Sequence, residues 1–204
     1  MGFLEDKRRA RIFYRYLSIV YDRINPFIWT EGMRQEALDL LDIDETDEVL
    51  DVGCGTGFGT AGLLQYTDTI YGLDQSPAQL GKARQKLDDE PVSFMLGDAE
   101  RLPFPDDSFD VVWSSGSIEY WPNPAETLAD IRRVCRPGGD VLIVGPNAPR
   151  SRIMRRIADA IMLFYDEREA DRLFDEAGFE SYEHHLMGPS YRPEIAITTH
   201  ARVN

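Results

Sequence analysis

The stretch VLDVGCGTGFG, residues 49–59, decides the fold. An apolar run carries Asp51 near its end, a loop follows with Gly53, Gly55 and Gly57, and we expect a helix after the loop. Glycines let a backbone turn sharply and approach a ligand closely, because no side chain stands in the way. The N–H groups of such a loop and of a helix N-terminus favour an electron-rich ligand group. The stretch therefore predicts a strand, a binding loop and a helix at the edge of an α/β sheet.

The glycine spacing separates two kinds of nucleotide-binding loop. The dinucleotide fold requires G-x-G-x-x-G, but Phe58 stands at the sixth position counted from Gly53, so the pattern here is G-x-G-x-G. A nicotinamide-dependent oxidoreductase is therefore disfavoured. A glycine loop alone is a weak sign of any ligand, so the acidic residues around it carry more weight.

Carboxylates stand at the ends of consecutive expected strands. Asp51 precedes the glycines, Asp74 ends the next apolar run with Gln75 behind it, and Asp98 follows the third run with Ala99 beside it. One such carboxylate alone is more simply a solvated loop residue, but three on the carboxyl edge of a parallel sheet indicate a ligand site. Asp74 is placed to accept both hydroxyls of a ribose. Asp98 is placed to accept a hydrogen bond from an adenine amino group.

Apolar runs alternate with amphipathic ones along the chain, which is typical of a parallel sheet with crossover helices. We expect strands at 47–53, 69–74, 92–97, 109–114, 140–145, 180–187 and 195–203. We expect helices at 3–20 and 30–42, over 76–87 with Ser76 as the N-cap, over 123–139 up to Pro137-Gly138-Gly139, and over 166–179 up to Gly178. The predicted class is α/β, with a doubly wound, Rossmann-like sheet of seven mostly parallel strands.

The length of 204 residues and the 43% hydrophobic content allow one substantial core, so we expect a single domain over residues 1–204. Residues 1–45 would form an N-terminal helical cap that acts as a lid, and residues 46–204 the sheet core, with a lid-like helix near 150–165. No apolar run is long enough to cross a bilayer, and the first residues lack the apolar core of a signal peptide. Cys54 and Cys135 have no C-x-x-C spacing, so neither a disulfide framework nor a metal site is expected. These features predict a soluble, cytoplasmic protein.

The net charge of the chain limits the classes of partner that it can bind. The formal net charge of −14 argues against nucleic acid, because binding phosphates needs a basic surface. The chain has 3 Lys against 19 Arg, and an acidic, Lys-poor surface is typical of proteins from high-salt cytoplasms. The sequence thus points to a halophilic protein with a small-molecule ligand.

With Asp51 ahead of the glycines, the loop resembles the E/D-x-G-x-G-x-G motif of class I S-adenosyl-L-methionine (SAM) methyltransferases. The segment GDAERLPFPDDSFD, residues 97–110, resembles the acidic loop of the same enzymes, with its Leu-Pro-Phe and Asp-Ser-Phe-Asp elements. The resemblance implies the class I fold and SAM as cofactor, with S-adenosyl-L-homocysteine (SAH) as product. The cofactor contacts that it implies are Asp51, Gly53, Gly55, Gly57, Asp74, Gln75, Asp98, Ala99, Ser114 and Tyr21.

Two further segments indicate the acceptor. Enzymes that methylate nucleic-acid amino groups typically carry Asn/Asp-Pro-Pro-Tyr/Phe after the fourth strand, whereas residues 114–121 here read SSGSIEYW. Residues 13–38, with Tyr21, Asp22 and Asn25, resemble the C-methyltransferases of ubiquinone and menaquinone synthesis. Together with SIEYWP they resemble still more the plant enzymes that methylate 2-methyl-6-phytyl- and solanesyl-benzoquinols. The resemblance implies C-methylation of a prenylated quinol, of the demethylmenaquinol or the methyl-prenyl-benzoquinol type.

Such a reaction needs an apolar pocket and a base. A ring carbon becomes nucleophilic when a quinol hydroxyl ionises, and its attack on the sulfonium methyl cancels two charges, which a dry pocket favours. We expect the substrate wall to include Tyr14, Tyr21, Tyr120, Trp121 and Phe164. The candidate bases are Glu119 first, then Asp22 and His184 or its neighbour His185.

Two segments combine basic and apolar residues, at 3–20 and 150–164. They are either solvated helix faces or surfaces that rest on an anionic membrane, which would place the protein at the inner face of that membrane.

Two other functions stay open. One is methylation of another small phenolic or lipid acceptor, such as a sterol, and the other is non-catalytic SAM binding as a sensor or subunit.

Overall fold

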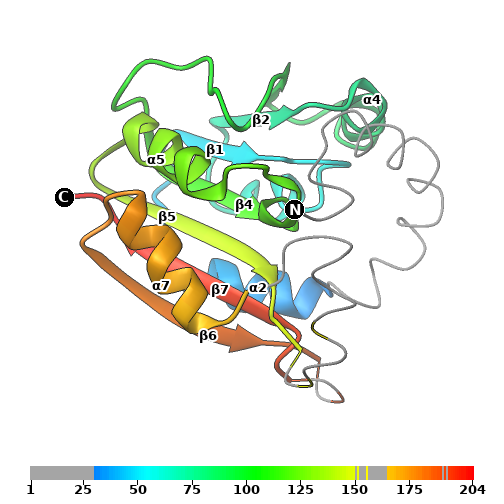
Figure 1. Cartoon of the computed structure of the whole chain (residues 1–204). Coiled ribbons are helices and arrows are strands. Elements are labelled where there is room, and N and C mark those ends of the chain that lie inside the picture. Colours follow the sequence, from blue (N-terminus) through cyan, green and yellow to red (C-terminus); the bar gives the residue numbers. More distant parts are fainter. Residues whose placement is uncertain (1–29, 150, 152–154, 156–164, 190, 192) are drawn as a thin grey trace.

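The computed structural model describes residues 30–149, 151, 155, 165–189, 191 and 193–204 (Figure 1). Their strands form one seven-stranded sheet in the order β3-β2-β1-β4-β5-β7-β6. The first five strands are parallel, and β7 runs antiparallel to both β5 and β6. The strands are β1 Val49–Val52, β2 Ile70–Asp74, β3 Val92–Leu96, β4 Phe109–Ser115, β5 Cys135–Pro146, β6 Ser181–Met187 and β7 Ala196–Arg202. The predicted doubly wound, mostly parallel sheet is confirmed.

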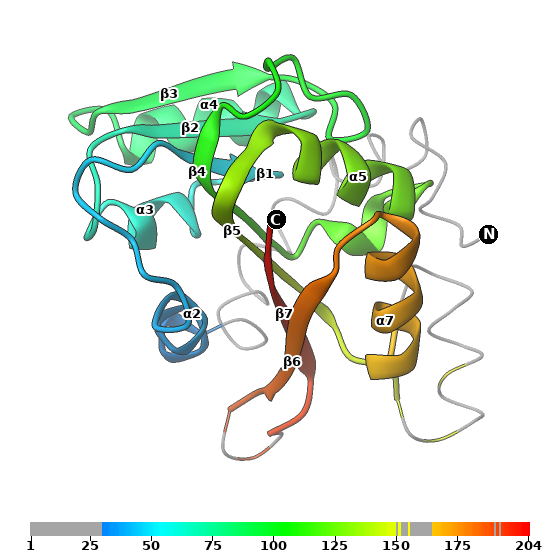
Figure 2. The ribbon, with the colours of Figure 1, turned by 90° about the vertical axis from the view of Figure 1, so that its left-hand side faces the viewer.

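Helices cover both faces of this sheet, because its central strands are apolar on both sides. The helices α5 (Pro124–Val134) and α7 (Glu167–Glu176) lie on one side, and α2 (Glu31–Leu38) and α3 (Thr60–Leu63) on the other (Figure 2). The first layer buries side chains such as Leu128 and Phe174 against β4, β5 and β7. The second buries Leu38 and Leu63 against β1 and β4. The helix α4 (Pro77–Lys86) packs on β2 and β3.

Local sequence signals explain where most helices begin and end. The side chain of Ser76 accepts a hydrogen bond from the backbone N–H of Gln79 at 3.4 Å, as the predicted N-cap of α4 requires. Asp166 and Glu169 form a capping box at the start of α7, and Gly178 follows that helix with φ +84°.

One predicted boundary is wrong. The helix α5 ends at Val134, and β5 already begins at Cys135, so Pro137-Gly138-Gly139 does not stop the helix but lies inside the strand. Cys135 pairs with Phe109, and the register between β4 and β5 then shifts before Asp140 pairs with Val111. Gly139 allows this irregularity, since a Cβ there would lie 2.5 Å from the carbonyl oxygen of Asp110.

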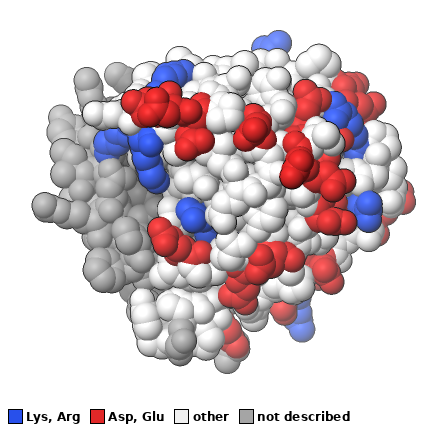
Figure 3. All heavy atoms as spheres, turned by 180° about the vertical axis from the view of Figure 1, so that it is seen from behind, with Lys and Arg blue, Asp and Glu red and all other residues white. Residues whose placement is uncertain are grey.

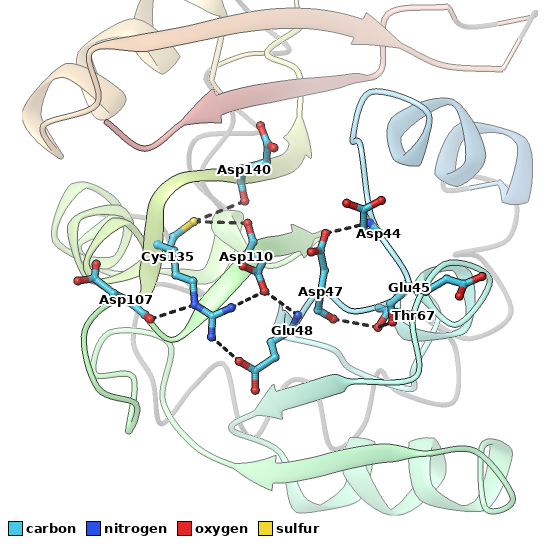
Figure 4. Close-up of polar contacts among 10 residues, drawn as sticks. Asp44, Glu45, Asp47, Glu48, Thr67, Asp107, Asp110, Cys135 and Asp140 are labelled. Carbon is cyan, nitrogen blue, oxygen red and sulfur yellow. Dashed lines mark hydrogen bonds and ion pairs between the residues drawn. The ribbon is translucent and has the colours of Figure 1, made fainter.

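The amino ends of β1 and β4 are joined by a polar network around Arg136 (Figure 4). Its guanidinium binds the carboxylates of Glu48 and Asp110 and donates to the carbonyl oxygen of Asp107 at 3.2 Å. The backbone N–H of Glu48 also donates to Asp110, at 2.9 Å. The network lies at the opposite edge of the sheet from the glycine loop, which leaves the carboxyl edge open for a ligand.

Of the N-terminal cap predicted over residues 1–45, the described part contains α2, which packs against the sheet beside α3. The helices predicted at 3–20 and 150–165 fall almost entirely outside the described residues. Within the described ranges, no helix is long and apolar enough to span a membrane. On the face opposite that of Figure 1, Asp and Glu outnumber Lys and Arg among the coloured residues (Figure 3), in keeping with the charge of −14.

Candidate active site

A cleft runs along the carboxyl edge of the sheet. Its walls come from the loops after β1, β2, β3 and β4, from the end of β5 and from the start of β7. Ligands of open α/β sheets bind at this edge, because the loops that leave the strands there can diverge around a ligand. The cleft contains most of the predicted cofactor residues that lie in the described part of the chain.

The glycine loop forms one wall. Gly53 and Gly55 line the cleft with φ values of +73° and +55°, in the left-handed region that glycine adopts without strain. A Cβ on Gly53 would lie 2.1 Å from the Oγ of Ser117, so any larger residue would collide with the loop after β4. Gly57 belongs to the same loop but does not line the cleft. A Cβ on Gly57 would lie 3.0 Å from the side chain of Leu87.

The side chain of Asp74 stands at the centre of the cofactor half of the cleft. Its Oδ2 accepts the backbone N–H of Gly55 at 2.9 Å, and its Oδ1 accepts that of Ser76 at 2.8 Å. Burial raises the pKa of this carboxyl, and the two backbone donors counteract the rise. Each carboxylate oxygen retains a second acceptor site. Asp74 therefore holds the loop and can still accept ligand hydroxyls, with Gln75 beside it in the wall.

Asp98 and Ala99 line the far side of the same half, after β3. The Oδ1 of Asp98 accepts the backbone N–H of Glu100 at 3.1 Å, which fixes a tight turn at the start of the acidic loop. Arg133 on α5 holds the rest of this loop by donating to the carbonyl oxygens of Phe104 at 2.9 Å and Leu102 at 3.3 Å. The loop is thus anchored to a core helix.

Two predicted cofactor residues point away from the cleft. Asp51 is 1% exposed and accepts the Thr60 hydroxyl at 2.6 Å, below the glycine loop. Burial raises its pKa to about 7. Ser114 is fully buried and donates to the carbonyl oxygen of Val52 at 2.7 Å, whereas its neighbours Ser115, Gly116 and Ser117 line the cleft. Side chains alternate along a strand, so a prediction one residue off selects the wrong face.

The segment after β4 forms the border between the two halves of the cleft. Ile118–Tyr120 make one turn of 3-10 helix, in which Ile118 enters the core while Glu119 and Tyr120 line the cleft. Trp121 also lines it, and its Nε1–H donates to the Oγ of Ser117 at 3.0 Å. This hydrogen bond ties the aromatic segment to the residue that faces Gly53.

Glu119 is the buried carboxylate of this border. It is 6% exposed, and its Oε2 has no hydrogen-bond partner among the described residues. Burial raises its pKa to about 7. A carboxyl with a pKa near neutrality and direct access to a cleft can accept or donate a proton under ordinary conditions.

The second half of the cleft is apolar, and none of the residues that form it is predicted above. They are Val144, Gly145 and Pro146 at the end of β5, and Ile195 and Ala196 at the start of β7. Phe58 adds to the glycine-loop wall and is held by Arg34, whose guanidinium carbon lies 4.7 Å from the ring centroid and whose Nη1 donates to the Phe58 carbonyl oxygen at 2.9 Å. In the sequence, the apolar run at the end of the fifth strand could have indicated this wall.

The structure does not bring His184 to the cleft. It lies on β6, the outermost strand, with Nδ1 at 2.8 Å from the Thr199 hydroxyl and Nε2 at 3.0 Å from Asp171. Its ring packs near Phe174 and Tyr182, so it serves the contact between α7 and the sheet. His184 is therefore not placed to act as a base in the cleft. The other predicted residues, Tyr14, Tyr21, Asp22 and Phe164, lie outside the described part of the chain.

Comparisons with known proteins agree with this geometry. Residues 50–143 match a family described as a methyltransferase domain. One chain of the complex between the Haloferax volcanii Trm112 methyltransferase activator and a methyltransferase superposes with a TM-score of 0.81 and 24% identity, covering 95% of this chain and 96% of that one. The fold is the Rossmann-like class I fold of methyltransferases, and residues 50–143 form a methyltransferase domain.

Within this class, the chain is similar to quinol methyltransferases. It is 46% identical over 193 residues to 2-methyl-6-phytyl-1,4-hydroquinone methyltransferase 2, chloroplastic, of Oryza sativa subsp. japonica, over 93% of this chain and 56% of that protein. It is 28% identical to the demethylmenaquinone methyltransferase of Chlorobaculum tepidum, over 76% of this chain and 68% of that protein. The chain thus spans little more than half the length of the plant relative.

Proposed function

We propose that this protein binds SAM in the cleft and transfers its methyl group to a ring carbon of a prenylated quinol. The observation that carries the proposal is the position of Glu119, a buried carboxylate at the border between a polar half with the cofactor motif and an apolar half. The similarity to quinol methyltransferases supports the same substrate class.

The polar half suits SAM group by group. Asp74 would accept the ribose hydroxyls, and Asp98 with the adjoining backbone of Ala99 would face the adenine. Gly53 and Gly55 present backbone next to the cleft, where the amino-acid part of SAM can approach without meeting a side chain. SAM supplies an electrophilic methyl on a sulfonium, and the chain supplies its position.

The apolar half suits the quinol. Val144, Pro146 and Ile195 offer no charge to the ring, while Tyr120 and Trp121 stand on the other side. Taking the substrate out of water favours joining a phenolate to a sulfonium, because the transition state carries less charge than the reactants. Alignment of carbon, methyl and sulfur contributes further, about 7–11 kcal/mol in well-oriented systems.

The proton balance assigns a role to Glu119. Its ionised carboxylate takes the proton of a quinol hydroxyl, the ring carbon forms a bond to the methyl, and the carbon–sulfur bond breaks to leave neutral SAH. The hydrogen on the methylated carbon then leaves as a proton, and the ring oxygen takes a proton back as the ring becomes aromatic again. One proton is released in each turnover.

The identity of the substrate is tested by incubating the full chain with methyl-labelled SAM and either reduced demethylmenaquinone or a methyl-prenyl-benzoquinol. We expect label on a ring carbon of one quinol, located by mass spectrometry. Label found on oxygen alone would refute C-methylation and favour another phenolic acceptor. SAH binding without methylation of any quinol would instead indicate a non-catalytic SAM-binding protein.

We also propose peripheral contact with an anionic membrane through residues 3–20 and 150–164, on the basis of their mixed basic and apolar sequence. A prenylated substrate resides in lipid, so such contact would bring the cleft to it. Co-sedimentation with vesicles containing phosphatidylglycerol, compared with neutral vesicles at low and high salt, tests this. No binding to either vesicle at both salt concentrations would rule the contact out.

A further inference from the structure

A buried tyrosine hydroxyl lies beside the proposed catalytic half of the cleft and has no assigned role. Tyr165 is 1% exposed, and its hydroxyl has no hydrogen-bond partner among the described residues. The backbone of Tyr165 is fixed to the end of β5, because its carbonyl oxygen accepts from Ala148 N–H at 3.1 Å and its N–H donates to the Pro146 carbonyl oxygen at 3.4 Å. The ring is therefore held at the end of the strand that lines the apolar half.

Gly145 shows where this hydroxyl points. A Cβ at position 145 would lie 2.5 Å from the Tyr165 hydroxyl and 2.5 Å from the Cγ2 of Ile118. The hydroxyl thus occupies space that only a glycine leaves open, between the end of β5 and the turn that carries Glu119. Gly145 itself lines the cleft together with Glu119.

The side chains of Glu119 and Tyr165 could form a hydrogen bond with each other. An ionised carboxylate only accepts hydrogen bonds, a phenol can donate one, and buried polar groups in native proteins nearly always have a partner. Among the described residues, the Oε2 of Glu119 and the hydroxyl of Tyr165 are both buried without one, so the two groups do not bond each other in this conformation, and a rotation of the Glu119 side chain is needed to join them. The hydroxyl lies next to Gly145 and Ile118, one residue from Glu119 in the chain, and burial followed by the charge of Glu119 raises the pKa of Tyr165.

Within the part of the chain that the structure describes, no charged side chain of β5 or β7 faces Glu119. The neighbouring positions that line the cleft on β5 and β7 are Val144, Gly145, Pro146, Ile195 and Ala196, none of which is charged. Its own turn contributes the phenol of Tyr120, and the Nε1–H of Trp121 is already bonded to Ser117. No described Lys, Arg or His contributes to the pKa of Glu119.

We propose that Tyr165 is a positioning residue: when SAM or its product SAH fills the cofactor half of the cleft, Glu119 rotates, the Tyr165 hydroxyl donates a hydrogen bond to one oxygen of its carboxylate, and the other oxygen faces the substrate. The inference rests on the proposed function of Glu119 as the base. Tyr165 stays a phenol throughout, and the proton taken from the quinol goes to Glu119. A donor on one side of the carboxylate favours its ionised form, so the base is available at a lower pH than it would be without Tyr165.

The test measures the titration of Glu119 in the SAH-bound full chain, by nuclear magnetic resonance with glutamate labelled with carbon-13 at the carboxyl, the signal being assigned by its loss in E119Q. Y165F keeps the ring and removes only the donor. We expect the midpoint of the Glu119 titration to rise by about one pH unit in Y165F, and the acidic limb of the pH–rate profile to move with it. Y182F is the matched control, because the Tyr182 hydroxyl is bonded to Asp175 at 2.6 Å, on the outermost strand. It should leave the midpoint unchanged.

The outcomes separate the two proposals. An unchanged Glu119 midpoint in a Y165F protein that folds and binds SAH overturns the role of Tyr165, even where quinol is methylated. A lower rate in Y165F at every pH with the same midpoint overturns it as well, since that pattern indicates packing alone. A raised midpoint in a protein that methylates no quinol supports the Tyr165–Glu119 contact and refutes the proposed function instead.

Discussion

The side chain of Asp74 holds the glycine loop directly, because its Oδ2 accepts the backbone N–H of Gly55 at 2.9 Å. The last residue of β2 therefore fixes the shape of the loop after β1, across the two neighbouring strands. A carboxylate at this position holds the loop and, in the proposed function, also binds the ribose. Changes to it should affect cofactor affinity more than folding.

We predict that Asp74→Asn weakens SAH binding by about 10- to 100-fold. Asn has one oxygen where Asp has two, so one of the N–H groups of Gly55 and Ser76 would face a donor, and a hydrogen bond to a charged group contributes about 1.5–3 kcal/mol. Titration calorimetry with SAH measures the change. Asp89→Asn, an exposed loop carboxylate, is the control and should bind normally. Affinity within twofold of the unmodified protein would contradict the role of Asp74.

Gly53→Ala should abolish measurable SAH binding, because the new Cβ would lie 2.1 Å from the Ser117 Oγ and the backbone has φ +73°. Adding Ser117→Gly removes the collision and should restore part of the affinity, though not the part lost to backbone strain. Gly81→Ala on α4 is the control, since nothing lies within 4 Å of a Cβ there. It should leave binding intact and raise the free energy of unfolding by about 0.5–1 kcal/mol in urea denaturation. Normal binding by Gly53→Ala would show that the loop is not next to the cofactor.

Much of the fold and part of the site could be predicted because they depend on local patterns. Strand positions follow from apolar runs, and Asp74 and Asp98 follow from the rule that strand ends meet at one edge. Ser114 and Asp51 show the limit of this reasoning. Both stand at the predicted places along the chain, but their side chains point into the protein. Ser115 faces the cleft instead of Ser114, because alternate residues of a strand face opposite sides, whereas Asp51 and both of its neighbours on β1 are buried.

The apolar wall could not be predicted from local patterns, because it depends on which distant segments pair. Ile195 and Ala196 reach the cleft only because β7 inserts antiparallel between β5 and β6, with Ala196 opposite Pro146. The position of His184 could not be predicted for the same reason, since the strand order places β6, and His184 with it, at the edge of the sheet. The role of Gly139 inside β5 also depends on a contact with β4, which the Pro-Gly-Gly sequence does not indicate.

Asp51 should make the protein less stable as the pH rises. Its pKa is raised to about 7 by burial in the folded state, whereas the ordinary pKa of an Asp side chain is 3.8, so the unfolded chain releases this proton at lower pH. The associated stability is fully present below about pH 4 and is lost progressively until the pH passes about 7. Asp51→Asn removes the titration and can retain the hydrogen bond from Thr60.

We therefore predict that Asp51→Asn gains stability over the unmodified protein between pH 5 and pH 8, by about 2–3 kcal/mol, since each pKa unit corresponds to ~1.4 kcal/mol. Urea denaturation of both proteins at the two pH values measures this difference, and the contributions of all other groups cancel. An identical pH dependence in the two proteins would mean that Asp51 ionises normally in the folded state.

Glu119→Gln should leave SAH affinity within about twofold and lower kcat/KM for the quinol by about 100- to 10,000-fold, the usual contribution of a general base. Gln fills the same volume but cannot take the proton of the quinol hydroxyl. In the unmodified protein the rate should rise with pH through about 7, because burial raises the pKa of Glu119 to that value and only the ionised carboxylate acts as a base. The residual rate of Glu119→Gln should lack this limb, and Glu119→Asp, which keeps a carboxylate at a shorter reach, should retain it with intermediate activity. Steady-state rates from pH 5 to pH 9 with saturating SAM measure all three. If Glu119→Gln keeps more than half of the activity, the base is another group and Glu119 is only part of the wall.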